Sequence, residues 1–420
     1  MGEGKNPAGY PAEDIKVLHE LAKKVAEAAA LPEQEKKRQM WYKHNALQRV
    51  RPMILVFPEG SWKEICELMF PSLCKDQRAA KIEWELRKRL FYHEFLQDDS
   101  PIEAVVQSPI VHWDSGFGIW AKEEAPDEKS GAKRFIPVIA EESDIDKITN
   151  PQVYVDWEKT EADYAALKDA LDGILPVAKG EPTVTWTVML DTFATWRGID
   201  QMYLDLYDRP AWVHEIMRRL TEANISRLKQ LERMGILRLN NREGYVGSGG
   251  VAYTHELPQP DFDGTHVRLK DLYGFSTTQT FTNVSPAMHD EFALQYEIRF
   301  LELFGLNCYG CCEPLHHKME YVKKIPRLRR VSISPWADLD AAARELEDKY
   351  IFSNKPNPEI IARNTWEPEE VRRDIRMRCE KTRGCVVEII MKDTHTCRRE
   401  PRRLREWVRI AREVAEEYGG

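Results

Sequence analysis

The sequence lacks the features that place a chain in a membrane, on nucleic acid or in an oxidising compartment. Its 420 residues contain no apolar run long enough to span a bilayer, and residues 1–14 lack the charged-then-apolar layout of a signal peptide. Acidic side chains outnumber basic ones, giving a net charge of -8, so neither a nucleic-acid surface nor a membrane surface is expected. Eight cysteines are too few for a disulfide scaffold in so long a chain, which predicts a reducing, cytoplasmic setting.

A dinucleotide-binding turn is also missing. The main glycine cluster, Gly247-Ser248-Gly249-Gly250, has neither the G-x-G-x-x-G spacing nor a helical pattern after it. This argues against an open, doubly wound nucleotide-binding sheet. The surrounding stretch 242–263 is rich in glycine and proline, and such a long loop is expected to be functional or mobile.

What the sequence does contain is an alternation of short apolar runs and helical patterns, repeated about eight times. The run 53–57, bounded by Pro52 and Pro58, is typical of a strand buried on both faces, as in a parallel sheet. Further strands are expected at or near 109–113, 184–190, 236–240, 271–275, 300–306, 330–334, 349–353 and 385–390. The pattern predicts an α/β fold, a (β/α)8 TIM barrel over residues 51–420 with long βα loops.

Residues 1–50 read as an extension to that barrel: a tail followed by helical arms at 15–30 and 35–45. The arms are expected either to cover the bottom of the main fold or to make an oligomer contact, as in a homodimer.

The most concentrated chemistry follows the apolar run at 300–306. Cys308, Cys311 and Cys312 fall within five residues, and Glu313, His316 and His317 come directly after them. Thiolates at the end of a strand are soft ligands that select zinc or a similar metal. The alternatives are a redox pair, a small structural zinc knuckle, or buried and inert cysteines.

Polar and aromatic side chains at the other strand ends are expected to shape one pocket. The acid–base candidates are Glu59, Asp114 and His395, and the candidate substrate walls are Trp62, Trp113, Tyr273, Gln279, Trp336 and Lys392. Loops at the carboxyl ends of barrel strands converge on one face, where such enzymes hold their active sites. Tryptophans are more often core than substrate wall, so core positions stay the alternative for them.

Several segments resemble the uroporphyrinogen decarboxylase superfamily. They are Tyr203-Leu204-Asp205-Leu206-Tyr207-Asp208-Arg209-Pro210 with Val213-His214-Glu215 after it, Glu367-Pro368-Glu369-Glu370-Val371-Arg372, and the last strand with Pro401. The likeness runs from about Val50 to the C-terminus and implies the same barrel. Decarboxylases of this family carry arginines after the first strand, where this chain has Glu59. A polyanion needs cationic partners, so we do not expect it to decarboxylate uroporphyrinogen.

The closer resemblance is to the branch of zinc-dependent methyltransferases that work with a corrinoid protein. That branch has His-x-Cys after the sixth strand and a cysteine after the eighth. Here Tyr309-Gly310-Cys311 and His395-Thr396-Cys397 stand at those places, with Tyr309 replacing the histidine. The resemblance implies zinc on Cys311 and Cys397, with the missing ligand supplied by Cys308, Cys312, Glu313 or His316.

The implied reaction moves a methyl group between a small methylated compound or thiol, an O-methyl ether being one candidate, and cobalt. The chain shows no corrinoid domain of its own, so the resemblance implies a separate corrinoid protein as partner. A decarboxylase-like enzyme and a non-catalytic barrel that binds a metal or ligand remain the alternatives.

Overall fold

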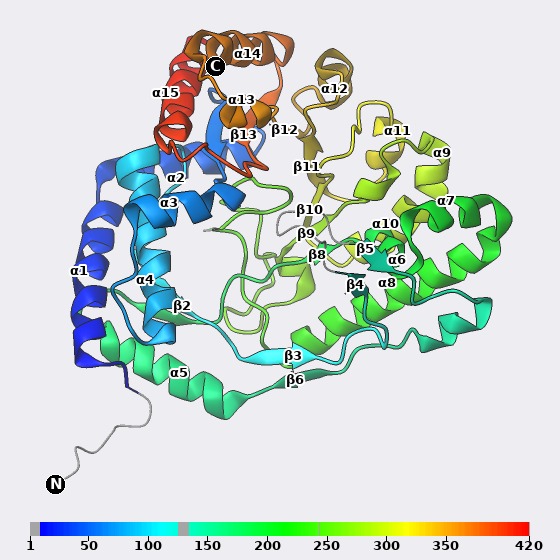
Figure 1. Ribbon diagram of the computed structural model, residues 1–420, viewed down its shortest axis with the longest axis horizontal. Helices are drawn as coiled ribbons and strands as arrows, with labels where there is room; N and C mark the ends of the chain where they lie inside the picture. Colours follow the sequence, from blue (N-terminus) through cyan, green and yellow to red (C-terminus); the bar gives the residue numbers. More distant parts are fainter. Residues whose placement is uncertain (1–8, 125–133, 243, 420) are drawn as a thin grey trace.

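The computed structural model describes residues 9–124, 134–242 and 244–419 (Figure 1). Its centre is a parallel sheet of seven strands in the order β1-β13-β12-β11-β10-β9-β8. These strands are β1 (Met53–Val56), β8 (Trp186–Thr187), β9 (Tyr273–Ser276), β10 (Leu306–Tyr309), β11 (Leu328–Ile333), β12 (Ile351–Asn354) and β13 (Val386–Met391). The first and last strands are neighbours, with Met53 opposite Glu388. A parallel sheet with intervening helices is the α/β class that the alternating pattern predicts.

The pairings among the described residues leave β1 and β8 as the two edges of this sheet. A closed barrel needs a further strand between them, and the predicted strand near His112 does not supply it. Three separate two-stranded sheets occupy the excursion instead: β2 (Val106–Ser108) with β7 (Val177–Lys179), β3 (His112–Asp114) with β6 (Val153–Val155), and β4 (Lys122–Glu124) with β5 (Arg134–Ile136). Figure 1 shows β3 and β6 along the lower side of the molecule, away from the main strands. The pairings among the described residues therefore show a parallel α/β sheet, and the closed barrel stays a prediction.

Two predicted strands are shorter than expected or absent. The run at 184–190 gives only the two residues of β8 before helix α6 begins at Met189. The run at 236–240 has no strand in the structure. There the Asn240 side chain makes hydrogen bonds to neighbouring backbone groups, where a strand would use its own backbone. Its Oδ1 accepts from the Tyr273 N–H at 2.9 Å, and its Nδ2 donates to the Thr183 carbonyl at 3.0 Å.

Helices precede, connect and follow the strands. The α-helices are α1 (Ala12–Ala29), α2 (Pro32–Asn45), α3 (Trp62–Met69), α4 (Gln77–Leu90), α5 (Trp157–Ala170), α6 (Met189–Arg197), α7 (Ile199–Asp208), α8 (Pro210–Arg233), α9 (Pro286–His289), α10 (Gln295–Leu301), α11 (Met319–Val322), α12 (Leu339–Leu346), α13 (Glu359–Ala362), α14 (Pro368–Lys381) and α15 (Arg402–Glu417). The 3-10 helices are η1 (Glu59–Ser61), η3 (Glu142–Lys147), η4 (Leu269–Asp271) and η5 (Gln279–Phe281). The π-helices are η2 (Phe91–Leu96) and η6 (Asp290–Leu294). The helical arms predicted at 15–30 and 35–45 are confirmed as α1 and α2. No helix within the described ranges is long and apolar enough to cross a membrane.

Amphipathic patterning explains how the helices pack. In α15 the buried side chains Leu404, Trp407, Val408, Ala411 and Val414 recur at helical spacing, while arginines and glutamates occupy the other face. Helix α15 packs against α14, and α1 packs against α4, pairs that lie side by side in Figure 1.

Four polar side chains lie together in the space enclosed by the sheet: His44, Asn45, Arg330 and Glu388. We refer to them as the interior cluster. Arg330 Nε donates to Glu388 Oε1 at 2.8 Å and Arg330 Nη2 to Glu388 Oε2 at 3.1 Å. Asn45 Oδ1 accepts from the same Nη2 at 2.8 Å, and His44 Nε2 lies 3.3 Å from Glu388. Burial raises the pKa of Glu388, but the charge of Arg330 and the His44 contact hold it at about 2. All four side chains are buried, so the end of α2 forms part of the interior.

Candidate active site

The cysteine stretch begins at the carboxyl end of β10. Gly310, with φ of +89°, makes the turn, and a Cβ there would lie 2.4 Å from Leu315 Cδ1, so only glycine fits. Cys311 is buried and Cys312 half-buried directly after this turn. The strand and its glycine thus bring two neighbouring thiols to the carboxyl edge of the sheet.

The Cys311 thiol is surrounded by donors and charge. Ser248 Oγ donates to Cys311 Sγ at 3.2 Å, and Cys312 Sγ lies 3.6 Å away. The hydrogen bond from Cys312 lowers the pKa of Cys311 most, burial opposes it, and the Lys392 ammonium and Ser248 help to bring it to about 7. At neutral pH a large share of Cys311 is therefore thiolate.

Lys392, at the carboxyl end of β13, links the thiols to the first strand. Its Nζ lies 3.5 Å from Ser248 Oγ and 3.7 Å from Glu59 Oε1. Asp393 donates its backbone N–H to the Glu59 carboxylate, and both residues have positive φ, +57° and +43°. Burial raises the pKa of Glu59, an effect that the nearby Lys392 charge opposes. We refer to Glu59, Ser248, Cys311, Lys392 and Asp393 as the edge site.

The loop between α8 and β9 delivers Ser248 to this place. Val246 donates its N–H to the Gly250 carbonyl at 2.8 Å, which closes a tight turn. A Cβ at Gly247 would lie 2.8 Å from Cys308 Cβ, and one at Gly250 would lie 2.4 Å from Arg330 Nε. The glycine cluster therefore lets the backbone pass between the interior cluster and the edge site.

A hollow of about 500 Å³ opens beside the edge site. Glu59 and Lys392 lie at one part of its wall, and the aromatic residues that line it are Phe57, Trp62, Tyr92, Tyr245 and Tyr253. Phe57 and Tyr245 meet edge to face at 5.4 Å between ring centroids, and Trp62 and Tyr92 at 6.1 Å. The predicted residues Glu59, Trp62 and Lys392 thus share one cavity with an aromatic wall.

The predicted zinc ligands do not converge. Cys397 is buried with its Sγ 3.1 Å from Glu64 Oε2, and the same carboxylate oxygen accepts the Cys397 N–H at 3.1 Å. Glu313 accepts from Thr277 Oγ1 at 2.7 Å and from the Cys311 N–H at 3.0 Å. Across the described residues, no three His, Cys, Asp or Glu side chains gather as a metal site. Cys311 and Cys312 offer a metal two sulfurs, which does not fit the three protein ligands of a catalytic zinc.

Other predicted site residues lie elsewhere or have other partners. Trp113 is exposed and stacks on Tyr154, and Asp114 Oδ2 lies 2.7 Å from Arg227 Nε of α8. Trp336 is 69% exposed after β11, and the His395 side chain is exposed.

Tyr273 is buried in β9 on the same side as Cys308, within the enclosed space. Gln279 donates its backbone N–H to Asp191 at 3.2 Å. Tyr273 also lines a hollow of about 300 Å³ with Trp186 and Phe275. Neither Tyr273 nor Gln279 is among the residues that line the hollow beside the edge site, so their role as substrate walls stays a prediction.

Sequence reasoning missed Ser248 and Lys355. Lys355 directly follows β12, is buried, and donates to Ser353 Oγ at 2.6 Å; burial lowers its pKa to about 8. Its place just past a strand was a usable signal. The glycine-rich loop was recognised as functional or mobile, but nothing in its spacing pairs Ser248 with Cys311.

No protein-family model matches the chain, and no curated protein matches it. Among solved structures, it is similar to a methyltransferase from Methanosarcina mazei, at 9% identity and a TM-score of 0.49, over 91% of this chain and 98% of that one. A likeness at this level carries no argument about function, which has to come from the residues at the edge site.

Proposed function

We propose that the chain is a methyltransferase that moves a methyl group between a small methylated compound or thiol and the cobalt of a corrinoid held by a separate protein. The observation that carries the proposal is the Cys311 thiol at the carboxyl edge of a parallel sheet, with its pKa lowered to about 7. One of the groups that lower this pKa, Lys392, lines the aromatic hollow. A thiolate is the reactive form of cysteine in methyl-group chemistry. The sequence resemblance to corrinoid-linked methyltransferases supports the same reaction class.

Cys311 and Lys392 divide the work in this proposal. The Cys311 thiolate attacks the methyl carbon, so a sulfur–carbon bond forms while the bond from that carbon to the substrate oxygen breaks. Lys392 then gives a proton to the departing oxygen, which leaves as a neutral hydroxyl compound. Passage of the methyl group from the Cys311 thioether to a reduced corrinoid on its carrier would break the sulfur–carbon bond and restore the thiolate. Lys392 would regain its proton from water. The Lys392 contacts of 3.5 and 3.7 Å are longer than good hydrogen bonds, so its ammonium can turn to a substrate oxygen.

The walls of the hollow favour a small, partly apolar substrate. Rings from Phe57, Trp62 and Tyr92 offer flat apolar faces, and Lys392 is the wall cation that acts on the Cys311 thiol. The other charged residues of the wall carry both signs: Glu59, Glu85, Lys88, Arg89 and Glu103. An O-methyl ether with a planar body matches both features better than a multiply charged compound.

Zinc has no step in this proposal, because the residues predicted to hold it do not converge. A corrinoid, when present, supplies a cobalt that exchanges the methyl group. The hollow has room for a small organic molecule, so the proposal keeps the corrinoid on its carrier, outside this chain.

The test follows methyl-cobalamin absorbance after mixing enzyme, cob(I)alamin and candidate ethers, amines or thioethers, with methylcobalamin and thiols for the reverse direction. Wild type should change the spectrum and Cys311→Ser should not. Cys385→Ser is the matched control, since Cys385 precedes the amino end of β13. No enzyme-dependent change in either direction would refute the function. Stoichiometric zinc, lost in Cys311→Ser, would refute the metal-free role of the thiol.

A further inference from the structure

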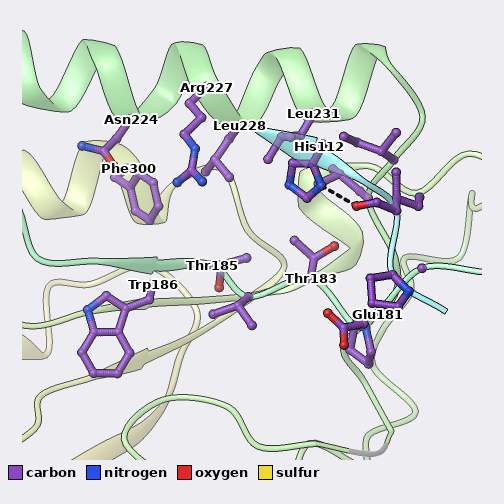
Figure 2. A pocket seen from close by; sticks show the side chains of 17 residues that line it. His112, Glu181, Thr183, Thr185, Trp186, Asn224, Arg227, Leu228, Leu231 and Phe300 are labelled. Carbon is purple, nitrogen blue, oxygen red and sulfur yellow. Dashed lines mark hydrogen bonds between the residues drawn. The ribbon is translucent and has the colours of Figure 1, made fainter. Parts of the chain in front are cut away.

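A second hollow, of about 270 Å³, lies at the amino ends of the strands (Figure 2). Residues 181–185 lead into the amino end of β8 and form one wall. Leu228 and Leu231 come from the last turns of α8, and Phe300 from the last turn of α10, just before β10 begins. Cys311 follows the carboxyl end of that same strand β10, so Phe300 in this hollow and the Cys311 thiol lie at opposite ends of β10.

The floor of this second hollow is apolar. It is lined by Ile110, Leu228, Leu231, Ile236, Leu237 and Phe300. Apolar side chains around a small cavity favour the alkyl part of a ligand, because burying it removes its surface from water.

One guanidinium stands over this floor. Arg227 Nε lies 2.7 Å from Asp114 Oδ2, which holds the side chain in place and leaves its two terminal NH₂ groups for another acceptor. Figure 2 shows the Arg227 guanidinium directed into the hollow between Asn224 and Leu228. Two terminal NH₂ groups in one plane match the two oxygens of a carboxylate.

Fixed partners orient the polar groups around Arg227. Asn224 Nδ2 donates to the Leu220 carbonyl at 2.8 Å, and His112 Nδ1 lies 2.9 Å from the Ile110 carbonyl. Glu181 stands at the rim and makes no ion pair with a cation of the described residues, and Asp114 already offsets the charge of Arg227. These two carboxylates would repel a multiply charged anion more strongly than a monocarboxylate, which needs only the terminal NH₂ groups of Arg227.

We propose that this hollow binds a short-chain monocarboxylate, with the carboxylate on Arg227 and the alkyl chain on the apolar floor. The site is independent of the proposed methyl transfer, since it shares no residue with the edge site. Asp114, which the sequence placed among the catalytic groups, here positions the cation that holds the ligand.

The experiment is equilibrium dialysis of the full chain with labelled butyrate, in competition with butyramide and butylamine. Butyrate should bind, and neither neutral nor cationic analogue should displace it at equal concentration. Arg227→Gln should weaken binding by at least about 10-fold, since a charge-assisted pair is lost. Arg233→Gln, an exposed arginine in the last turn of the same helix, should stay within about 2-fold of wild type.

A second variant protects the test against misfolding. Asn224→Asp keeps Arg227 but adds a negative charge beside it, so it should also weaken butyrate binding while thermal unfolding stays that of a folded protein. Cys311→Ser should bind butyrate like wild type, whatever its effect on methyl transfer. Undetectable butyrate binding, equal binding of butyramide, or unchanged binding in Arg227→Gln would overturn the proposal.

Discussion

The interior cluster and the edge site use the same kinds of groups to different ends. In the interior, Arg330 and Glu388 meet through two hydrogen bonds of 2.8 and 3.1 Å, both side chains are buried, and Asn45 accepts a further hydrogen bond from Arg330. At the edge, Lys392 lies 3.7 Å from Glu59, in a pair whose side chains remain 14% and 35% exposed. The close pair is complete without a ligand, whereas the loose pair keeps capacity for one.

This difference separates a structural role from a chemical one. A buried ion pair is expensive to break because the remaining charge is left without water or a partner. A half-buried pair at the mouth of a hollow can exchange partners at low cost, which is what a passing substrate requires. Charged residues deep in a parallel sheet are therefore no guide to the active site by themselves.

The largest expected effect is on stability, from Arg330→Met. The substitution leaves Glu388 buried without its guanidinium partner, so the free energy of unfolding should fall by roughly 3–5 kcal/mol. Lys392→Met, the matched change at the edge, should cost less than about 1 kcal/mol. Urea unfolding of both variants beside wild type measures this. Equal losses would mean that the two pairs do the same structural work.

The next effect is on activity, from Cys311→Ser. Methyl transfer should fall by at least about 100-fold, because a hydroxyl near neutral pH does not replace a thiolate nucleophile. Unfolding free energy should stay within about 1 kcal/mol of wild type, which is the reverse of the Arg330 variant. Initial rates and urea midpoints on the same preparations give both numbers. Activity that survives the substitution would remove Cys311 from the reaction.

A smaller effect is expected on substrate affinity, from Trp62→Ala. Loss of one aromatic wall should raise KM by about 10-fold with kcat less affected. Trp336→Ala, at a side chain that is 69% exposed, should leave KM unchanged. Because Trp62 also packs on Trp84, Trp62→Phe is included and should restore most of the affinity. A larger increase in KM for Trp336→Ala than for Trp62→Ala would indicate that the substrate binds at another part of the sheet edge.

The smallest effect is a shift in a titration. Alkylation of Cys311 by iodoacetamide should rise through a midpoint near pH 7, since the thiolate reacts and the pKa is about 7; below that pH the rate falls with protonation. Lys392→Gln removes a charge that favours the thiolate, so its midpoint should rise by about one unit. Cys397 should stay unmodified, because burial raises its pKa to about 12. Peptide mass spectrometry after timed alkylation reads each cysteine separately. An unshifted midpoint in the Lys392 variant would show that the Lys392 ammonium does not lower the pKa of Cys311.

The sequence predicted the positions of strands and helices better than it predicted which strands and side chains pair with one another. The run ending at Phe57 and the helical arm starting near Ile15 were predicted because burial periodicity is local, and both are confirmed as β1 and α1. Closure of the sheet was not predictable in this way, because it depends on which distant segment pairs with β1. The excursion after β1 pairs within itself instead.

The candidate site shows the same limit. Glu59, Trp62 and Lys392 were found because each stands just past a strand and the strand ends meet at one edge. Cys397 stands near a strand end as well, but Glu64 of α3 accepts both its thiol and its backbone N–H. The local sequence pattern predicts that a residue follows a strand. It does not predict that a carboxylate from a distant helix, here Glu64 of α3, accepts that residue's hydrogen bonds.

The Asn45 amide has a consequence for how the chain folds. Its Nδ2 donates to the Val251 and Tyr253 carbonyls at 2.9 and 2.8 Å, and its Oδ1 accepts from Arg330, whose partner Glu388 lies still further along the chain. One hydrogen-bonded group thus joins segments separated by more than half of the sequence. Forming this group closes long loops, which costs conformational entropy, so we expect it to form late on the folding pathway and refolding to be slow. In partly folded states, backbone amides near this group should show little protection from hydrogen exchange. During synthesis, Asn45 emerges long before Glu388. The polar side chains at the end of α2 therefore lack their partners until the last strand has been made.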